Sequence, residues 1–205
     1  MTKLTMFYDF TTPKDSLSLQ EIIAMIRLGE WELEIKNIQK HLSEGRDESA
    51  SQLKKKLPAF TPAGTFLENR SNKTLNRYSQ IIHLDFDKLE QDDLDELIHK
   101  VNRIPYTHAY FISPSGRGLK VFVRVDSSQE LHKEVFKEIR SLYTNKTDVV
   151  SDSSCQDIAR LCFISFDSQA YYNPDSEVYK AENNEDFRAI ERLKKGVEKK
   201  KQYVN

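Results

Sequence analysis

The sequence has 205 residues, of which 38% are hydrophobic and 31% are charged, so it can bury one substantial core under a charged surface. Its 31 basic and 32 acidic residues nearly cancel, so overall charge does not indicate nucleic-acid binding, and any anion site must be a local patch. Without a signal peptide, a membrane-length apolar window or zinc-finger spacing of the two cysteines, we expect a cytoplasmic protein with reduced thiols and no membrane partner.

The first part of the chain alternates between strand-like and helix-like patterns. These patterns predict a strand over 4–10, helices over 16–29 and 31–42, a polar loop over 44–50 and a short basic helix over 51–58. The segment 59–78 contains proline, glycine and basic residues and is expected to be irregular, and long segments of this kind often carry function.

The second part of the chain again mixes strands and helices without strict alternation. We expect strands over 79–87, 107–113, 119–125 and 157–166, helices over 90–104, 128–145 and 183–203, and a hairpin turn at 114–118. The order predicts an α+β fold with a mixed, largely antiparallel sheet and flanking helices. The expected parts are 1–78, strand and helices packed on the core; 79–182, the core; and 183–205, a basic helix or linker.

An acidic pair ends the strand predicted over 79–87. In an extended chain alternate side chains share a face, so His83, Asp85 and Asp87 point the same way. Two neighbouring carboxylates repel each other unless a cation or a proton intervenes. The pair therefore indicates a metal site, although a capping and solubility cluster at the edge of a sheet explains it equally well. His83 is expected to orient one of the carboxylates rather than to act in catalysis.

The predicted hairpin has the composition of a phosphate-binding turn. Its sequence, ISPSGRGLKVFV, contributes Ser113, Ser115, Gly116, Gly118 and, just past the turn, Lys120. Glycine lets the backbone approach a ligand, and successive N–H groups can form an anion-binding nest. The spacing is not that of a Walker A motif, and an ordinary hairpin with basic decoration is the alternative.

A third aspartate, Asp152, precedes an apolar segment that contains Arg160. Arg160 can bind a phosphate, or it can form a structural salt bridge with Asp157 or Asp167. Together, the carboxylates, the turn and the cations are the parts of a two-metal phosphoryl-transfer site that takes two Mg²⁺ or Mn²⁺ ions roughly 4 Å apart.

The order HLDFD, SPSGRGLKVFV and DSSCQDIARLCF resembles the archaeo-eukaryotic primase (primase-polymerase) superfamily. The flanking phrases LPAFTPAGTF and RLCFISFDSQAYYNP are similar to the VirE N-terminal-like domain family within it, and the likeness covers roughly residues 4–180. The resemblance implies a palm-like, RRM-like catalytic core with an N-terminal helical extension. It also implies a DNA primase-polymerase that makes and extends primers on a single-stranded DNA template from nucleoside triphosphates.

The resemblance also assigns roles to individual residues. Asp85, Asp87 and Asp152 would be the catalytic metal ligands. The nucleotide would be bound by Ser113, Ser115, Gly116, Gly118, Lys120 and Arg160. One departure is that Lys120 stands where the superfamily usually has histidine. Lysine can neutralise a phosphate as a point charge, but it cannot act as a neutral imidazole. Helicase modules and CRISPR adaptation proteins are the partner systems that the resemblance implies.

Template and primer contacts are expected from basic and aromatic residues near the core. The preferred candidate contacts are Arg70, Arg77 and Tyr78. The basic run Lys54, Lys55 and Lys56 is a further candidate, but a solvated helix face explains it equally well. Three alternatives to a primase remain: a primase-like module that binds nucleotides or nucleic acid without catalysis, a two-metal nuclease, and a purely structural acidic cluster.

Overall fold

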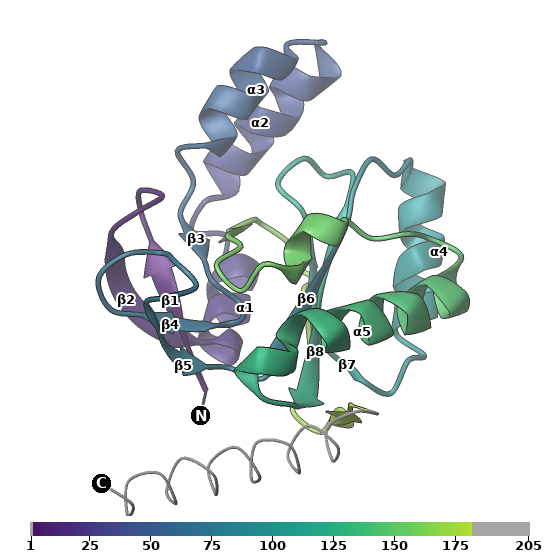
Figure 1. Cartoon of the computed structure of the whole chain (residues 1–205). Coiled ribbons are helices and arrows are strands. Elements are labelled where there is room, and N and C mark those ends of the chain that lie inside the picture. The colour runs from purple at the N-terminus through teal and green to yellow at the C-terminus, as the bar shows by residue number, and fades with distance from the viewer. Residues whose placement is uncertain (1, 182–205) are drawn as a thin grey trace, which may run out of the picture.

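The computed structural model describes residues 2–181 and shows an α+β fold with largely antiparallel sheets, as the sequence predicts (Figure 1). No helix in this described part combines the length and the apolar character that a membrane crossing needs. The predicted basic helix over 183–203 and the C-terminal part 183–205 lie outside the described residues.

The N-terminal layer is a small sheet with one helix. Its strand order is β2-β1-β3-β9, with all pairs antiparallel. The elements are β1 (Lys3–Phe7), β2 (Pro13–Ser18), α1 (Leu19–Leu28), β3 (Ala59–Phe60) and β9 (Cys162–Phe163). Ser18 and Glu21 form a capping box that starts α1, and Gly29 ends it with a φ of +76°. The expected helix over 16–29 therefore starts later, because residues 13–18 pair with β1.

A two-helix arm projects from this layer, as Figure 1 shows. The helical arm consists of α2 (Glu32–Ser43) and α3 (Asp47–Lys54), and its own small core contains Ile35, Ile38 and Ala50. The polar loop expected over 44–50 is wrong in its second half, because α3 begins at Asp47. Asp47 and Glu48 lie in the first turn, where carboxylates are favoured by the helix dipole.

The central sheet is built around one long strand. β8 (Leu119–Asp126) lies between β6 (Ile81–Phe86) and β7 (Thr107–Ile112), both antiparallel to it. The edges are β10 (Tyr171–Tyr172) beside β7 and β11 (Tyr179–Lys180), which pairs in parallel with β8. The connections contain α4 (Gln91–Val101), the 3₁₀ turn η1 (Gln129–Leu131), α5 (His132–Thr147) and the 3₁₀ turn η2 (Ser153–Gln156).

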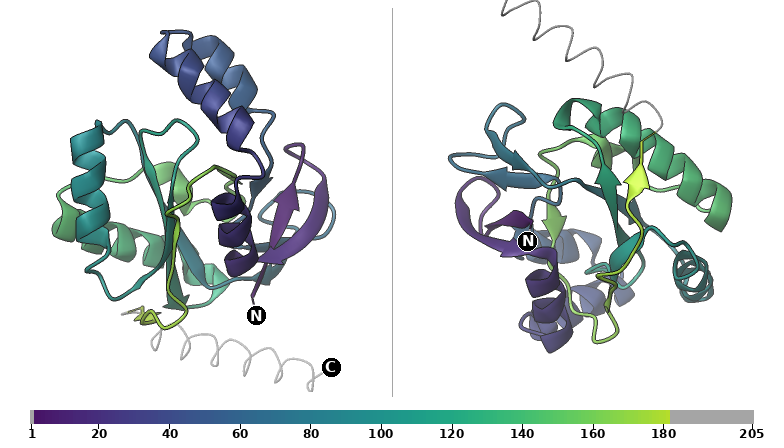
Figure 2. Two further views of the ribbon diagram at one scale, coloured as in Figure 1. Left: turned by 180° about the vertical axis from the view of Figure 1, so that it is seen from behind. Right: turned by 90° about the horizontal axis from the view of Figure 1, so that it is seen from below.

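The two faces of this sheet pack against different layers (Figure 2). Ile82, Leu84 and Phe86 pack against α4 and α5 on one face, whereas Ile81 and Phe122 pack against α1 and β1 on the other. Full burial of each such side chain contributes about 1.5–3 kcal/mol. Because side chains alternate along a strand, the polar residues at 83, 85 and 120 are buried on the second face, between the sheet and the N-terminal layer.

Two expected elements are corrected by the structure. The irregular segment 59–78 contains β3 and a hairpin of β4 (Gly64–Phe66) and β5 (Leu75–Tyr78). The strand expected over 157–166 is reduced to Cys162–Phe163, because only these two residues have a partner strand, β3. Arg160 lies before that strand, in a turn in which its N–H donates to the Asp157 carbonyl at 2.9 Å.

Candidate active site

The site begins with a buried ion pair between two central strands. Asp85 on β6 lies opposite Lys120 on β8, and Lys120 Nζ contacts Asp85 Oδ2. Their side chains are 9% and 5% exposed, respectively, so both charges have left water, which is costly unless they are paired. Burial lowers the pKa of Lys120, but Asp85, Cys162 and Asp87 together outweigh burial and hold that pKa above its ordinary value. Lys120 is therefore charged at neutral pH.

Asp87 lies just past the end of β6 and is exposed to solvent at the mouth of the site. Desolvation by the surrounding walls is the main cause that raises the pKa of Asp87. The carboxylates of Asp85 and Asp152 raise it further, while Lys120 and Lys54 oppose the shift. The two lysines thus offset the two carboxylates, and the net rise comes from desolvation. A bound cation would favour the charged form of Asp87.

Asp152 is tied directly to the strand that carries Asp85. Its N–H donates to the Asp85 carbonyl at 2.7 Å, and its carboxylate accepts from Ser154 N–H at 2.9 Å and forms an ion pair with Arg160 at 3.3 Å. Partial burial raises the pKa of Asp152, but the Ser154 hydrogen bonds and Arg160 outweigh it and the net shift is downward. The structure therefore brings Asp152, which is distant in sequence, to the strand end that carries Asp85 and Asp87.

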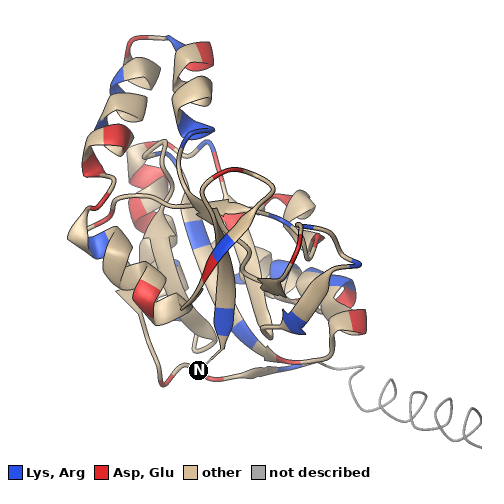
Figure 3. Ribbon diagram, turned by 90° about the vertical axis from the view of Figure 1, so that its left-hand side faces the viewer, with Lys and Arg blue, Asp and Glu red and all other residues tan. Residues whose placement is uncertain are grey.

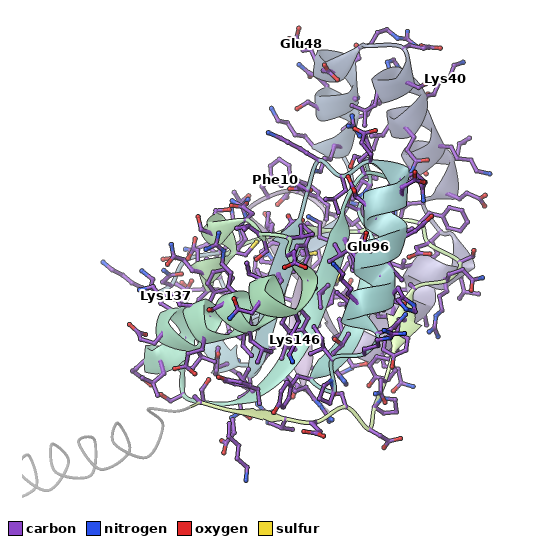
Figure 4. All side chains as sticks on the ribbon, turned by 90° about the vertical axis from the view of Figure 1, so that its right-hand side faces the viewer. Phe10, Lys40, Glu48, Glu96, Lys137 and Lys146 are labelled. Atoms are coloured by element: carbon purple, nitrogen blue, oxygen red, sulfur yellow. The ribbon has the colours of Figure 1, made fainter. Side chains whose placement is uncertain are left out.

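A cleft of about 400 Å³ opens beside this acidic group. Its basic lining residues are Lys54, Lys55, Arg70, Lys120 and Arg160, and its aromatic ones are Phe10 and Phe163. Figure 3 shows Lys or Arg beside Asp or Glu on adjacent central strands, and Figure 4 shows Phe10 beneath the helical arm. Cations thus surround the carboxylates, which suits a ligand that carries several negative charges.

The base of the helical arm forms one wall of the cleft. Lys54, the last residue of α3, extends over the Phe163 ring, with Nζ 5.5 Å from the ring centroid. Burial is the main cause that lowers the pKa of Lys54, and nearby Lys120 lowers it further, while Asp87 and Asp85 raise it. A lysine held near another cation is well placed to bind an anion that neutralises both.

The predicted phosphate turn joins β7 to β8 next to Asp87. Ser113 N–H donates to the Gly118 carbonyl at 2.8 Å, Gly116 N–H donates to the Ser113 carbonyl at 2.9 Å, and the Ser113 and Ser115 hydroxyls are 3.0 Å apart. Gly116 has a φ of +73°, which favours glycine. These small residues flank Asp87 but are not among the residues that line the cleft.

Gly118 is required by close packing. A Cβ atom there would lie 2.4 Å from the Phe86 carbonyl oxygen and 3.0 Å from Asp87 Oδ1. We expect Gly118→Ala to lower the free energy of unfolding in urea by about 1–3 kcal/mol through overpacking. Gly45→Ala isolates backbone strain, because no atom of the described residues lies within 4 Å of a Cβ at this position and only the strain of its φ of +70° acts. A loss below about 1 kcal/mol for Gly118→Ala would contradict this account of Gly118.

The expected template contacts separate into two groups. Arg70 lines the cleft, and its guanidinium donates to the Phe10 carbonyl at 3.2 Å and the Ala159 carbonyl at 2.5 Å. Arg77 is exposed on β5, and neither it nor Tyr78 lines the cleft. The Tyr78 hydroxyl contacts His132 Nδ1 at 2.9 Å, and burial raises the pKa of Tyr78 to about 12.

Some residues of the site were not singled out from the sequence. Phe10 and Phe163 carry no motif, and their shared position follows only from the pairing of β1 and β9 with β3. Lys54 and Lys55 appeared only within a basic run, whose helical spacing does not say which lysines face the core. His83 was expected to orient a carboxylate, but neither ring nitrogen has a hydrogen-bond partner among the described residues.

The fold and the site define an α+β domain with a cation-lined cleft that includes Asp85 and Asp87. Asp152 is bonded to the strand beneath them but does not line the cleft. A family comparison matches residues 52–172 to the BT4734-like, N-terminal domain. The match spans more than half of the chain and includes all three aspartates, Lys120 and Arg160, so the chain belongs to this family. No curated protein matches the sequence. No solved structure matches it either.

Proposed function

We propose that this domain is the catalytic domain of a DNA primase-polymerase, which joins nucleotides on a single-stranded DNA template. The observation that carries the proposal is the hydrogen bond from Asp152 N–H to the Asp85 carbonyl, which joins the third aspartate to the strand whose Asp85 lines a cation-lined cleft together with Asp87. Membership of a family linked to primase-like proteins and the motif resemblance to the primase-polymerase superfamily support it. Helicase modules and CRISPR adaptation proteins are its proposed partner systems.

The acidic group suits hard divalent cations. Mg²⁺ and Mn²⁺ prefer carboxylate oxygens together with substrate phosphates. Desolvation raises the pKa of Asp87, and a divalent ion beside it would favour its charged form. Asp85, Asp87 and Asp152 would hold two of these ions. When bound, the ions supply activation of the attacking 3′-hydroxyl and stabilisation of the leaving pyrophosphate.

The remaining residues of the cleft position the substrates. Lys54, Lys120 and Arg160 neutralise the triphosphate, and the Arg160 guanidinium can contact phosphate while its other edge holds Asp152. Phe10 and Phe163 offer ring faces for a base, and such stacking contributes about 1–3 kcal/mol per base. The cleft volume of about 400 Å³ fits one nucleotide-sized ligand.

The basic run of α3 gives a matched test of the phosphate site. Lys54 lines the cleft, whereas exposed Lys56, two residues on, does not. We expect Lys54→Ala to raise the Kd for a nucleoside triphosphate about tenfold, equivalent to about 1.4 kcal/mol, and Lys56→Ala to change it less than twofold. Calorimetric titration measures both variants. Equal effects would show that the run acts only as a diffuse positive charge.

The proposed activity is tested by primer synthesis without a pre-existing primer. The wild-type chain is incubated with single-stranded DNA, Mg²⁺ or Mn²⁺, and either ribo- or deoxynucleoside triphosphates. We expect template-dependent products only when a divalent ion is present. A chain that binds nucleotides but neither starts nor extends a primer would overturn the proposal.

One observation favours a second function, a primase-like module that binds nucleotides or nucleic acid without catalysis. The Lys120 ammonium group contacts Asp85 Oδ2, an oxygen that a catalytic metal ion would need as a ligand. If the ammonium group holds this position permanently, the cleft binds nucleotides without turnover. Nucleotide binding that persists without any divalent ion, together with absent extension, would favour this second function.

A further inference from the structure

Three side chains of different chemistry meet in the interior next to the aspartate group. One ligand atom each from His83, Asp85 and Cys155 lies within 4.8 Å of the other two, and all three residues are buried. His83 and Asp85 share a face because they are two residues apart on β6. Cys155 comes from η2, which is anchored to β6 by the bond from Asp152 N–H to the Asp85 carbonyl.

Polar atoms in this cluster lack partners. Within the described part of the chain, neither ring nitrogen of His83 forms a hydrogen bond, and Asp85 Oδ1 forms none either. His83 is 5% exposed and stacks on Phe122, with ring centroids 5.2 Å apart, so water does not solvate its nitrogens. Each unsatisfied buried polar group costs about 1–3 kcal/mol. Such groups in a native protein call for an ion or water that completes them.

We propose that His83, Asp85 and Cys155 bind one Zn²⁺ ion, at a position next to those of Mg²⁺ or Mn²⁺ in the cleft, with Asp85 shared between the two sites. Imidazole nitrogen, thiolate sulfur and carboxylate oxygen are the three donor types that Zn²⁺ takes, at about 2.0–2.3 Å. Tetrahedral bonds of this length place ligand atoms roughly 3.5 Å apart, so small side-chain shifts close the site. Mg²⁺ is excluded because it does not favour thiolate or imidazole.

The ion pair between Lys120 and Asp85 leaves one carboxylate oxygen for the zinc ion. Lys120 contacts Asp85 Oδ2, which leaves Oδ1 for the metal. Zn²⁺ and Lys120 then face the carboxylate of Asp85 and the thiolate of Cys155, while nearby Arg160 forms an ion pair with Asp152. The thiol loses its proton to solvent as the zinc–sulfur bond forms, because a coordinating thiol is deprotonated by the metal.

A small cavity supplies the fourth ligand. It has a volume of about 10 Å³ and is lined by His83, Cys155 and His132. This is roughly the space of one water molecule. His132 Nε2 is buried and has no hydrogen-bond partner within residues 2–181, and its Nδ1 is held by the Tyr78 hydroxyl at 2.9 Å. A zinc-bound water in this cavity would satisfy His132, and the ion would fasten η2, and with it Asp152, to β6.

The test is zinc binding by the full chain. After dialysis against Zn²⁺ and removal of loose metal, we expect about one zinc per chain by mass spectrometry. Cys155→Ser and His83→Gln should each weaken zinc binding by at least about 100-fold, since even loss of an outer partner of a metal ligand costs 10–100-fold. Cys162→Ser removes the other buried thiol and should leave zinc binding unchanged.

Substitution of Co²⁺ for Zn²⁺ gives a readout on the wild-type chain itself, so the decisive result does not require that Cys155→Ser or His83→Gln folds. The wild-type chain loaded with Co²⁺ should show thiolate-to-cobalt charge transfer in the near ultraviolet, and Cys162→Ser should retain the band. A wild-type chain that binds no zinc, a Co²⁺ spectrum without the thiolate band, or full zinc content in Cys155→Ser would overturn the proposal. The site does not rest on the proposed activity, so failed primer synthesis leaves these outcomes unaffected.

Discussion

Asp87→Asn is expected to lower templated primer extension about 1,000-fold or more, equivalent to about 4 kcal/mol of transition-state stabilisation, without loss of stability. Asparagine keeps the shape of the side chain but removes the charge that would bind a metal ion. The folded-state pKa of Asp87 is raised, so the folded protein disfavours the charged form at neutral pH. The asparagine variant should therefore be as stable as the wild type at pH 7, or more stable.

The sign of this effect also gives a pH test. A raised carboxyl pKa means that the folded state binds a proton more readily than the unfolded state does, so stability from this group is present at acid pH and lost as pH rises through the folded pKa. The stability advantage of Asp87→Asn over the wild type should thus shrink as the pH falls toward 3.8, the ordinary pKa of an aspartate carboxyl group. Urea unfolding at several pH values measures it.

Asp92→Asn is the matched control for Asp87→Asn. Asp92 is exposed in the first turn of α4, where its carboxylate favours the helix dipole and faces no cleft. We expect full primer extension and a loss of stability below about 1 kcal/mol. If Asp87→Asn retained the activity of Asp92→Asn, the acidic group would be structural, and the proposed nucleotidyl transfer would be wrong.

Local patterns predicted the faces of the central strands correctly. The alternation in β6 placed Ile82, Leu84 and Phe86 on one side and His83 and Asp85 on the other, as the structure shows. Such patterns depend only on the period of an extended chain. They failed over 157–166, where an apolar segment resembles a strand although only Cys162 and Phe163 meet a partner.

The pairing of Asp85 with Lys120 was beyond the reach of local patterns. Both residues were predicted as site residues, but Lys120 was expected to bind phosphate rather than to neutralise Asp85. The contact depends on the antiparallel register of β6 and β8, which α4 and β7 separate along the chain. The cleft wall has the same origin, because Phe10, Lys54 and Phe163 come from three distant segments.

Lys120→Met is expected to lower the free energy of unfolding by about 3–5 kcal/mol, because it leaves Asp85 as a buried, unpaired charge. Asp85 is 6% exposed, and its Oδ1 already lacks a partner among the described residues. An exposed salt bridge would cost only about 0–1 kcal/mol when broken. Urea unfolding at pH 7 separates these values, and a loss below about 1 kcal/mol would contradict a buried pair.

A double variant apportions this loss between the two partners. Adding Asp85→Leu to Lys120→Met removes the stranded charge, and replacing a buried ion pair by apolar residues of similar volume is often neutral or stabilising. The double variant should therefore be more stable than Lys120→Met alone. If Asp85→Leu instead lowers the free energy of unfolding further, the two side chains stabilise the fold separately. The ion pair would then not be the main reason for the loss in Lys120→Met.

The same variant distinguishes a metal site from a permanent ion pair. In Lys120→Met, a divalent ion is the only added cation that can neutralise Asp85, so millimolar Mg²⁺ or Mn²⁺ should raise the Tm of this variant more than that of the wild type. In the wild type the ion must compete with the ammonium group for Asp85 Oδ2. An equal shift in both proteins would mean that the added ions do not reach Asp85, and the acidic group would then lack the cation site that nucleotidyl transfer requires.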